Sequence, residues 1–245
     1  MCGIAGIMNK GKHGNPMGER TLIGLHKAMT VQKHRGPDDS GVCAFQIRSG
    51  RGAIEEASDA MQLLNKGKYD GMIGFNRLSI KDLSKAGHQP MVSLDKKVIL
   101  AFNGEIYNDV ELREMLIGKG HHFQSSTDTE VLLAMYLEYG FMDMLPRLNG
   151  MFAIVIMDLR QNMLFMARDR FGIKPLYYSF QGERLYFASE LKCMIQFEEF
   201  LRELDMDAVN ARLIFSRPSG KILMKNVEIM EPGQAMSMSP EGDIR

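Results

Sequence analysis

The sequence lacks an excess of charge of either sign. It carries 30 basic and 30 acidic side chains, and no basic cluster forms a stripe that could follow a phosphate backbone. It also lacks any run that approaches the ~20 apolar residues a membrane-spanning helix needs. We therefore expect neither a nucleic-acid partner nor a membrane, and a small, neutral metabolite is the expected partner.

Cysteine and tryptophan are also scarce. The three cysteines, Cys2, Cys43 and Cys193, are an odd number without paired spacing, and tryptophan is absent. This pattern fits a reducing compartment better than a disulfide framework, so we expect a cytoplasmic protein. The 45% of apolar residues is typical of an ordinary soluble globular domain.

Sequence features of a metal or nucleotide site are missing as well. His121 and His122 have no Cys, Asp or His near them at ligand spacing, so we expect no metal and place both in a solvated loop. Residues 6–13 have the glycine and lysine spacing of a phosphate loop but lack the Ser or Thr that would hold magnesium. No cofactor is therefore expected in this chain.

Short apolar runs bounded by turn residues predict that strands dominate the chain. They fall at residues 4–8, 42–47, 72–75, 98–102, 151–157, 163–167, 176–180 and 185–188. Helices are predicted over residues 19–34, 110–117 and 129–139, and the last opens with the capping-box pattern Thr127-x-x-Glu130. Residues 51–70 are polar and show no strand signal, so we interpret them as a surface excursion. The elements together predict an α+β domain with layers of helix over sheet.

Cys2 is a candidate nucleophile, because removal of Met1 would leave a residue with both a thiol and a free α-amino group. An α-amino group titrates near ~7.7 to 8, so it can take the proton of a thiol directly or through a water. The predicted strand at residues 4–8 would hold this terminus in a sheet. The alternative is that Cys2 is a small buried apolar residue without reactivity.

A polar segment follows the predicted strand at residues 98–102 and reads Asn103-Gly104-Glu105-Ile106-Tyr107-Asn108. A side-chain amide and a permissive glycine amide would then lie side by side at a strand end, where they could hold an oxyanion. A thioester-forming reaction needs two such donors, and removal of one costs about 10² to 10³ in rate. A plain Asn-Gly turn is the alternative interpretation.

Two charged residues could hold an amino acid. Arg77 ends a short apolar strand, where its planar fork could grip a carboxylate; a surface arginine is the alternative. Asp128 lies in the first turn of a predicted helix, where an acid is stabilised simply by the helix dipole. A zwitterion requires one cationic and one anionic clamp, and this pair supplies both. The turn-rich segment at residues 34–41, taken alone, is typical of a helix stop and loop.

Taken in order, these residues resemble the class II glutamine amidotransferases, and specifically the asparagine synthetase branch. The matching motifs span essentially the whole chain and are Cys2-Gly3-Ile4, His34-Arg35-Gly36-Pro37-Asp38, Arg77-Leu78-Ser79-Ile80, Gln89-Pro90, Asn103-Gly104-Glu105-Ile106-Tyr107-Asn108, residues 126–130 and Arg168-Asp169-Arg170-Phe171-Gly172-Ile173-Lys174-Pro175-Leu176-Tyr177-Tyr178. The resemblance implies an N-terminal-nucleophile hydrolase fold, a four-layer αββα sandwich of two mainly antiparallel sheets between helix layers. It also implies one glutaminase domain over residues 1–245.

The resemblance implies a chemical role for three of these residues. Cys2 would attack the side-chain amide of glutamine, while its own amine moves protons. The Asn103 side chain and the Gly104 amide would bind the oxyanion. Ammonia would leave first, and water would then hydrolyse the γ-glutamyl thioester to glutamate.

The resemblance also implies how the amino-acid end of glutamine is held. Arg77, together with the backbone of Leu78 and Ile80, would bind the carboxylate. Glu105 and Asp128 would take the ammonium.

In the family the ammonia travels to a C-terminal synthetase domain that activates aspartate with ATP and magnesium. We expect that domain to be absent from this chain, because no Ser-Gly-Gly-x-Asp pyrophosphate loop occurs in it. The resemblance leaves a homodimer open. Two alternatives also stay open: a glutaminase that serves another acceptor, such as a carboxylated sugar, and a glutamine-sensing or scaffolding module that does not turn over.

Two departures from the family pattern concern the glutamine pocket. The excursion at residues 51–70 is longer than expected between these motifs. Phe75-Asn76 stands where the family often has His or Ala followed by Glu. Both could alter access to the pocket or its closure.

We predict that Cys2 is the N-terminal residue of the active protein, since its small side chain permits removal of Met1 and an acylated amine could not move protons. Intact mass or N-terminal sequencing of active protein measures this directly. Full activity with Met1 retained would rule out the amine as the base.

Overall fold

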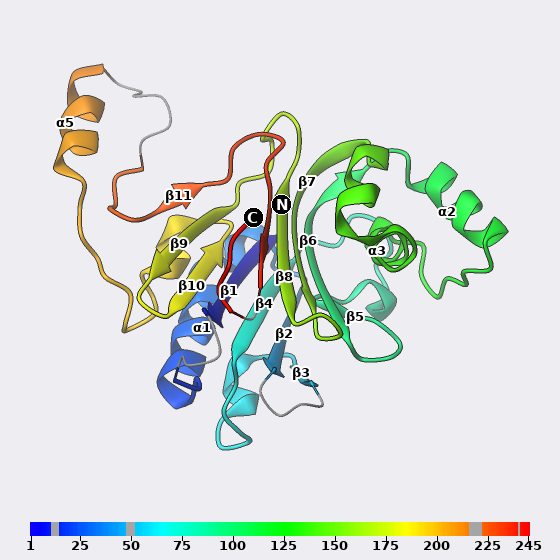
Figure 1. Ribbon diagram of the computed structural model, residues 1–245, viewed down its shortest axis with the longest axis horizontal. Helices are drawn as coiled ribbons and strands as arrows, with labels where there is room; N and C mark the ends of the chain where they lie inside the picture. Colours follow the sequence, from blue (N-terminus) through cyan, green and yellow to red (C-terminus); the bar gives the residue numbers. More distant parts are fainter. Residues whose placement is uncertain (11–14, 48–51, 216–221, 240) are drawn as a thin grey trace.

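Two antiparallel sheets form the centre of the molecule (Figure 1). The computed structural model describes residues 1–10, 15–47, 52–215, 222–239 and 241–245. In sheet order, the seven-stranded sheet comprises β11 (Glu228–Ile229), β9 (Tyr177–Gln181), β10 (Arg184–Ala188), β1 (Gly3–Asn9), β4 (Gly71–Arg77), β2 (Asp39–Gln46) and β3 (Ala53–Ala57). The five-stranded sheet comprises β12 (Ala235–Met238), β8 (Met163–Arg168), β7 (Gly150–Asp158), β6 (Val98–Ile106) and β5 (Met91–Val92).

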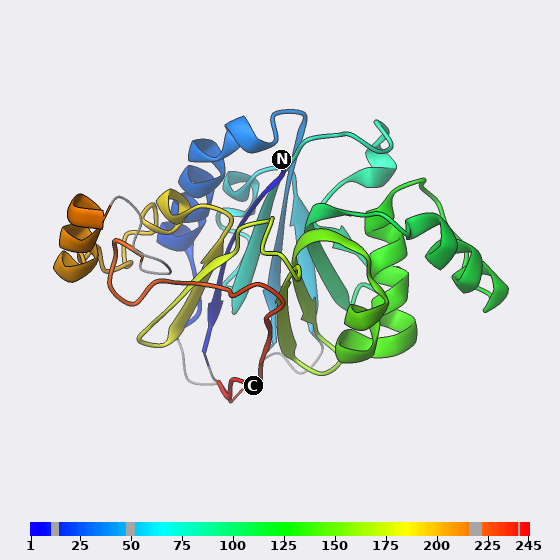
Figure 2. The same cartoon turned by 90° about the horizontal axis from the view of Figure 1, so that it is seen from above.

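Helices cover the outer face of each sheet (Figures 1 and 2). The α-helices are α1 (Glu19–Val31), α2 (Asp109–Gly118), α3 (Asp128–Met144), α4 (Leu191–Met194) and α5 (Met206–Phe215). Four 3₁₀ turns are described, η1 (Lys33–Arg35), η2 (Ala60–Leu63), η3 (Lys85–Gly87) and η4 (Leu145–Arg147). Helix α1 lies on the seven-stranded sheet and α3 on the five-stranded sheet, whereas α5 projects from the body.

Three layers of apolar side chains hold these four layers together. In β1, Ile4 packs between the sheets and Ala5 packs beneath α1. In β6, Ala101 packs between the sheets and Phe102 packs beneath α3. Successive side chains of a strand point to opposite faces, so a strand covered on both sides reads as a continuous apolar run. The expected αββα sandwich is confirmed.

The predicted elements are found, with different ends. Each predicted strand and helix coincides with an element of the structure, and α1 gives way to η1 within residues 19–34. Helix α3 continues past the predicted end to Met144, but Gly140 interrupts it with φ 74°. A left-handed glycine ends a regular helical turn, and this explains why the helical spacing stopped at residue 139.

The interpretation of residues 51–70 as an excursion without a strand was wrong. The part that the structure describes, residues 52–70, contains β3, which pairs with β2 from Val42 opposite Ala57 to Gln46 opposite Ala53. An edge strand takes its stability from backbone hydrogen bonds to a single neighbour and needs few apolar side chains, so the apolar pattern is weak. The following η2 buries Ala60 and Leu63 against α1.

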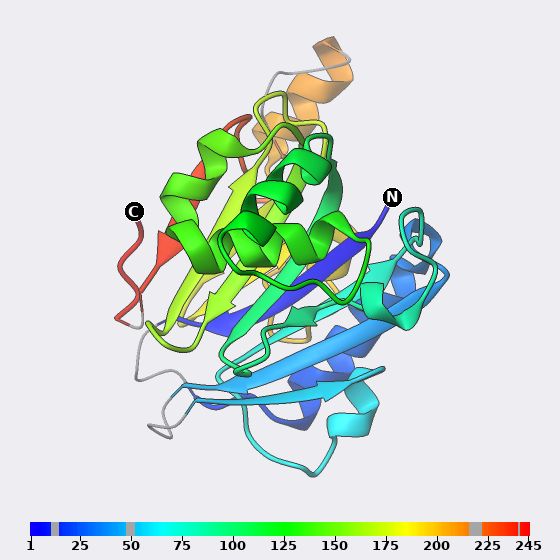
Figure 3. The same cartoon turned by 90° about the vertical axis from the view of Figure 1, so that its right-hand side faces the viewer.

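The two chain ends lie at opposite ends of the sheets (Figures 2 and 3). Strand β4 runs antiparallel to β1 with Gly3 opposite Asn76, so Arg77 at the end of β4 lies at the same end as Cys2. The start of α3 also lies at this end, because Asp128 bonds to Ile106 at the end of β6. Chain segments far apart in the sequence are thus brought together around the N-terminus.

We predict that Gly6→Ala lowers the free energy of unfolding by ~1–3 kcal/mol through overpacking. A Cβ at Gly6 would clash with the Phe187 ring and lie 2.9 Å from the carbonyl oxygen of Met72. Chemical denaturation measures the change. Gly118→Ala is the matched control, because a Cβ at that helical glycine would meet nothing within 4 Å. It should leave stability unchanged or raise it by about 0.5–1 kcal/mol, and equal losses in both variants would contradict the packing argument.

Candidate active site

Cys2 is held by its backbone at the start of β1. The Nε of Arg35 donates to the carbonyl oxygen of Cys2 at 2.8 Å, and Nη1 of Arg35 donates to Glu190 at 3.1 Å. The neighbouring Gly3 packs so closely on Gln32 that a Cβ would lie 2.7 Å from its Cδ. These contacts fix the residue that carries the thiol although it is next to a chain end.

The segment at residues 34–41 has a wider role than ending α1. Besides the Arg35 contact, Asp38 accepts a hydrogen bond from the backbone N–H of Ser79 at 2.8 Å. The backbone N–H of Asp38 donates to the carbonyl of Arg77 at 3.1 Å. The segment therefore also anchors the chain that leaves β4, which we call the 78–84 loop.

The thiol of Cys2 is half-buried against this loop. Its Sγ accepts from the backbone N–H of Leu78 at 3.4 Å and lies 3.7 Å from the Leu78 carbonyl oxygen. Burial raises the pKa of the Cys2 thiol, and the Leu78 hydrogen bond and the charges of the chain terminus, Arg77 and Lys174 oppose this effect. Because the pKa is raised, the thiol needs a base to act as a nucleophile at neutral pH.

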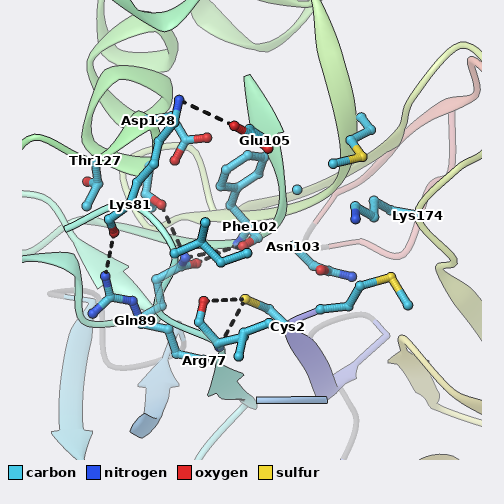
Figure 4. Close-up of a pocket in the computed structure, with 16 residues that line it drawn as sticks. Cys2, Arg77, Lys81, Gln89, Phe102, Asn103, Glu105, Thr127, Asp128 and Lys174 are labelled. Atoms are coloured by element: carbon cyan, nitrogen blue, oxygen red, sulfur yellow. Dashed lines mark hydrogen bonds and ion pairs between the residues drawn. The ribbon is translucent and has the colours of Figure 1, made fainter. Parts of the chain in front are cut away.

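One pocket brings every predicted site residue together (Figure 4). Its walls include the predicted residues Cys2, Arg77, Leu78, Ile80, Asn103, Gly104, Glu105 and Asp128. They also include residues that sequence reasoning did not place in the site, namely Met1, Lys81, Gln89, Phe102, Thr127, Thr129, Met151 and Lys174. Of these, Gln89, Thr127, Thr129 and Lys174 belong to matching motifs, which was a usable signal, whereas Lys81 gave none.

Asn103 and Gly104 lie inside β6 and not at the predicted strand end. Strand β7 continues the ladder, with Asn103 opposite Ala153 and Gly104 opposite Phe152. A plain Asn-Gly turn is thereby excluded. Because Ala101 faces the space between the sheets, Asn103, two residues on, faces the same way.

Three residues of β6, Phe102, Gly104 and Ile106, turn their backbone N–H groups to the outer edge of the strand, away from β7. The N–H of Phe102 donates to Oε1 of Gln89 at 2.7 Å, and Nε2 of Gln89 donates to the Phe102 carbonyl at 3.2 Å. The N–H of Ile106 donates to Asp128 at 3.0 Å. Gly104 lies midway between them, so the period of two turns its N–H to the same edge.

Contacts on the β7 side agree with this orientation. The N–H of Phe152 donates to Asp169 at 3.2 Å, and the Phe152 carbonyl accepts from the N–H of Asp169 at 2.9 Å. Phe152 therefore turns its polar groups away from Gly104. In the described part of the chain the buried Nδ2 of Asn103 has no hydrogen-bond partner. The register turns the Gly104 N–H to the outer edge of β6, beyond the two residues that pair with β5. Two donors therefore lie side by side at the pocket.

Arg77 is only 5% exposed, which excludes the surface-arginine alternative. Its guanidinium donates to the carbonyl oxygens of Ser84 at 3.1 Å, Lys81 at 3.2 Å and Asp82 at 2.5 Å. An arginine has five N–H donors, so two remain for another acceptor. Arg77 consequently shapes the 78–84 loop besides presenting positive charge to the pocket.

Asp128 opens α3 and is buried. Thr127 caps this helix, since its Oγ1 accepts from the N–H of Glu130 at 3.2 Å, so the N-cap half of the predicted capping box is confirmed. Burial raises the pKa of Asp128, and the Ile106 N–H and the charge of Lys81 oppose this effect. The helix dipole therefore accounts for only part of its environment, because Asp128 also ties α3 to β6.

Lys174 reaches the pocket from a loop organised by one buried carboxylate. Asp169 accepts hydrogen bonds from the backbone N–H groups of Phe152, Phe171, Ile173 and Lys174. Burial opposes ionisation of Asp169, but these hydrogen bonds outweigh it and lower its pKa. The clamp places the Lys174 side chain, which is 7% exposed, near Cys2.

The two departures from the family pattern do not form the pocket. Phe75 packs in the core between the sheets, and the side chain of Asn76 accepts from Gln32 Nε2 at 3.0 Å. Within the described part of the excursion, residues 52–70, no residue lines the pocket. The expected effect of these departures on access to the pocket is therefore not supported.

Among the described residues, no three His, Cys, Asp or Glu side chains lie together in a group that could hold a metal ion. Of the two histidines considered in the sequence, His121 instead contacts Glu138 at 3.0 Å. None of the helices described is both long and apolar enough to cross a membrane. The phosphate-loop-like segment extends into residues 11–13, which lie outside the described part of the chain.

The two-sheet sandwich places the thiol of Cys2 beside the start of β1, in the wall of a pocket with charged side chains of both signs. A family model described as a glutamine amidotransferase domain matches residues 51–244. The chain therefore belongs to the glutamine amidotransferase domain family.

The sequence is similar to asparagine synthetases, as its motifs predicted. It is 37% identical over 247 residues to asparagine synthetase (glutamine-hydrolyzing) 1 of Bacillus subtilis (strain 168), covering 100% of this chain and 34% of the relative. It is 32% identical over 253 residues to asparagine synthetase (glutamine-hydrolyzing) 3 of the same organism, covering 99% of this chain and 35% of the relative. The chain thus spans 34 to 35% of the length of these relatives.

Solved structures share the fold. The glutamine phosphoribosylpyrophosphate amidotransferase of B. subtilis, complexed with ADP and GMP, superimposes with a TM-score of 0.69 at 22% identity, covering 100% of this chain and 48% of that chain. A second structure, described as the allosteric regulatory enzyme of purine biosynthesis, gives a TM-score of 0.69 at 21% identity, with the same coverage of both chains. At this identity the likeness concerns the fold alone.

We predict that Lys174→Met moves the pH profile of Cys2 alkylation to higher pH. The charge of Lys174 lowers the Cys2 pKa against the effect of burial, so its removal raises that pKa further and reduces the thiolate present at a given pH. Iodoacetamide labelling followed by mass spectrometry of the Cys2 peptide measures the profile. The buried Cys43 and Cys193 serve as internal controls, and an unchanged profile would place Lys174 outside the electrostatic field of the thiol.

Proposed function

We propose that the chain hydrolyses the side-chain amide of glutamine through a thioester on Cys2, releasing glutamate and ammonia. The observation that carries this proposal is the buried, unpaired Nδ2 of Asn103, which lies beside the outward-turned Gly104 N–H at the pocket that holds the thiol. A buried donor without a partner costs about 1–3 kcal/mol, so a site retains one for a reason. Two donors beside a nucleophile suit the oxyanion of a tetrahedral intermediate.

In the proposed reaction the sulfur of Cys2 attacks the amide carbon of glutamine. The thiol proton passes to the α-amino group of Cys2, which becomes free when Met1 is removed. The oxygen that gains negative charge accepts hydrogen bonds from Asn103 and Gly104. The proton then moves to the leaving nitrogen, ammonia departs, and water attacks the thioester to give glutamate and restore the thiol.

The charged walls of the pocket support glutamine as the ligand. The buried guanidinium of Arg77, which already bonds three loop carbonyls, would receive the carboxylate together with the backbone of Leu78 and Ile80. Glu105 and Asp128 would receive the ammonium. A zwitterion matches this arrangement better than a ligand with charge of a single sign.

We further propose that a synthetase domain or subunit uses the ammonia to amidate aspartate with ATP and magnesium. The names of the relatives support this, as does the small share of their length that the chain covers. An exposed surface on α5 supports a partner, because Met206, Leu213 and Ile214 are 57%, 78% and 71% exposed. Apolar side chains gathered on a projecting helix suit an interface with another domain or subunit.

The alternatives differ in what they require of the site. A module that only senses glutamine needs the charged clamps but no nucleophile and no oxyanion donors. A glutaminase that serves a different acceptor needs the same pocket, and its acceptor site would lie outside these residues. Free thiols on all three cysteines suit a reducing compartment, and we propose the cytoplasm.

We predict that Cys2→Ala abolishes glutamate release and leaves the fold intact, since a small residue replaces a small one. The chain with Cys2 exposed as its N-terminus should hydrolyse glutamine without ATP and form no asparagine by itself. Glutamate, asparagine and AMP are followed separately in a mixture with glutamine, aspartate and ATP-magnesium. Glutamate release by Cys2→Ala at a comparable rate would refute the nucleophile, and its absence from intact protein would favour the sensing module.

For Arg77→Lys we predict a KM for glutamine raised by roughly tenfold with a smaller change in kcat. A lysine ammonium cannot reproduce the planar fork that faces both the loop carbonyls and the carboxylate. Steady-state kinetics measures the change. The exposed Arg20, with 77% of its side chain accessible, gives the matched control Arg20→Lys. Equal KM values for the two variants would remove Arg77 from substrate binding.

A further inference from the structure

Lys81 reaches the part of the pocket where the acids gather. Its Nζ lies 3.0 Å from Oδ1 of Asp109 and 3.7 Å from Oε1 of Glu105. Figure 4 shows its ammonium at the same side of the pocket as Glu105 and Asp128. The side chain is 34% exposed, so the cation is neither sealed in the protein nor free in solvent.

The ion pairs of Lys81 are not needed to hold the 78–84 loop. Before Lys81, the backbone N–H of Ser79 donates to Asp38 at 2.8 Å. After it, Asp82 accepts from the backbone N–H of Ser126 at 3.1 Å. The loop is therefore fastened on both sides by other hydrogen bonds, and the Lys81 side chain is left for a role in the pocket.

Charge in this corner of the pocket is not balanced. Three carboxylates, Glu105, Asp109 and Asp128, act on the ammonium of Lys81. Burial alone would lower the pKa of Lys81, but the Asp109 hydrogen bond and the negative charges around it outweigh burial and raise it, so Lys81 is a cation at neutral pH. Because these three carboxylates outnumber the one ammonium, the local potential favours the binding of a second cation.

We propose that Lys81 is an internal competitor for the ammonium subsite, which occupies it in the empty pocket and thereby sets the affinity for the amino acid. The proposal rests on the proposed function, in which Glu105 and Asp128 bind the α-ammonium of glutamine. When the ligand binds, Lys81 keeps its shorter contact with Asp109 and gives up the longer contact with Glu105. The tethered cation therefore weakens only ligands that place a cation at these acids.

The test is a pair of ligands measured against Lys81→Met. Glutamine carries the α-ammonium, and 4-carbamoylbutanoate has the same carboxylate and amide without it. In the Cys2→Ala background, which prevents turnover, calorimetry should show glutamine binding about three- to tenfold tighter after Lys81→Met. The amine-free ligand should gain nothing. With Cys2 intact, the KM for glutamine should fall by the same factor while kcat stays unchanged.

Two matched variants accompany this measurement. Lys81→Arg keeps a cation of similar reach and should restore the parent affinity. Lys85→Met removes a neighbouring exposed lysine that does not line the pocket and should change nothing. Weaker glutamine binding by Lys81→Met, or an equal change for both ligands, would overturn the competitor role.

Failure of the proposed function is distinguishable from failure of this inference. A parent that releases glutamate from glutamine, together with a Lys81→Met variant of unchanged KM, overturns the inference alone. A parent with an exposed Cys2 terminus that neither binds glutamine nor releases glutamate overturns both. If Lys81→Met binds glutamine more tightly and 4-carbamoylbutanoate equally well, the result supports both the proposed function and this inference.

Discussion

The hydrogen bond from Arg35 to the carbonyl of Cys2, 2.8 Å long, is the constraint on which the site depends. A chain end has a covalent neighbour on one side only and frays unless something ties it down. Here the tie is a buried cation that is itself held by Glu190, and the close packing of Gly3 on Gln32 completes it. The thiol of Cys2 is thereby carried on a backbone that a hydrogen bond and close packing hold in place.

The second constraint is the edge of β6, where the short β5 leaves the outer residues unpaired. A sheet edge exposes N–H and C=O groups that must find partners. The side-chain amide of Gln89 pairs with Phe102 as a neighbouring strand would, and Asp128 receives the N–H of Ile106. Only every second residue of β6 turns its N–H to this edge, so Gly104 is the one such residue between Phe102 and Ile106. Two polar side chains therefore determine which backbone N–H of this edge of β6 faces the pocket.

Much of this could be predicted from the sequence, because continuous apolar runs report strands buried on both faces and spaced motifs report the residues around the pocket. Strand ends could not be predicted, since β6 continues to Ile106 through pairing with β7 and not through its own apolar residues. Edge strand β3 escaped prediction for a related reason, because its hydrogen bonds come from β2. The sequence around Lys81 does not indicate that this residue lines the pocket, because its contact with Asp109 is made only in the folded chain.

The acids that line the pocket must also be accommodated when the pocket is empty. Isolated carboxylates in a half-buried pocket favour protonation of one another, because burial and like charges both oppose ionisation. Asp128 shows this effect, since burial raises its pKa and the charge of Lys81 opposes the rise. The charge of Lys81 favours the ionised form of Asp128, but in the proposed competition a ligand with an ammonium must then displace that charge. In this proposal Lys81 has two opposing effects: it favours the ionised form of Asp128 in the empty pocket, and it lowers the affinity for a ligand that carries an ammonium.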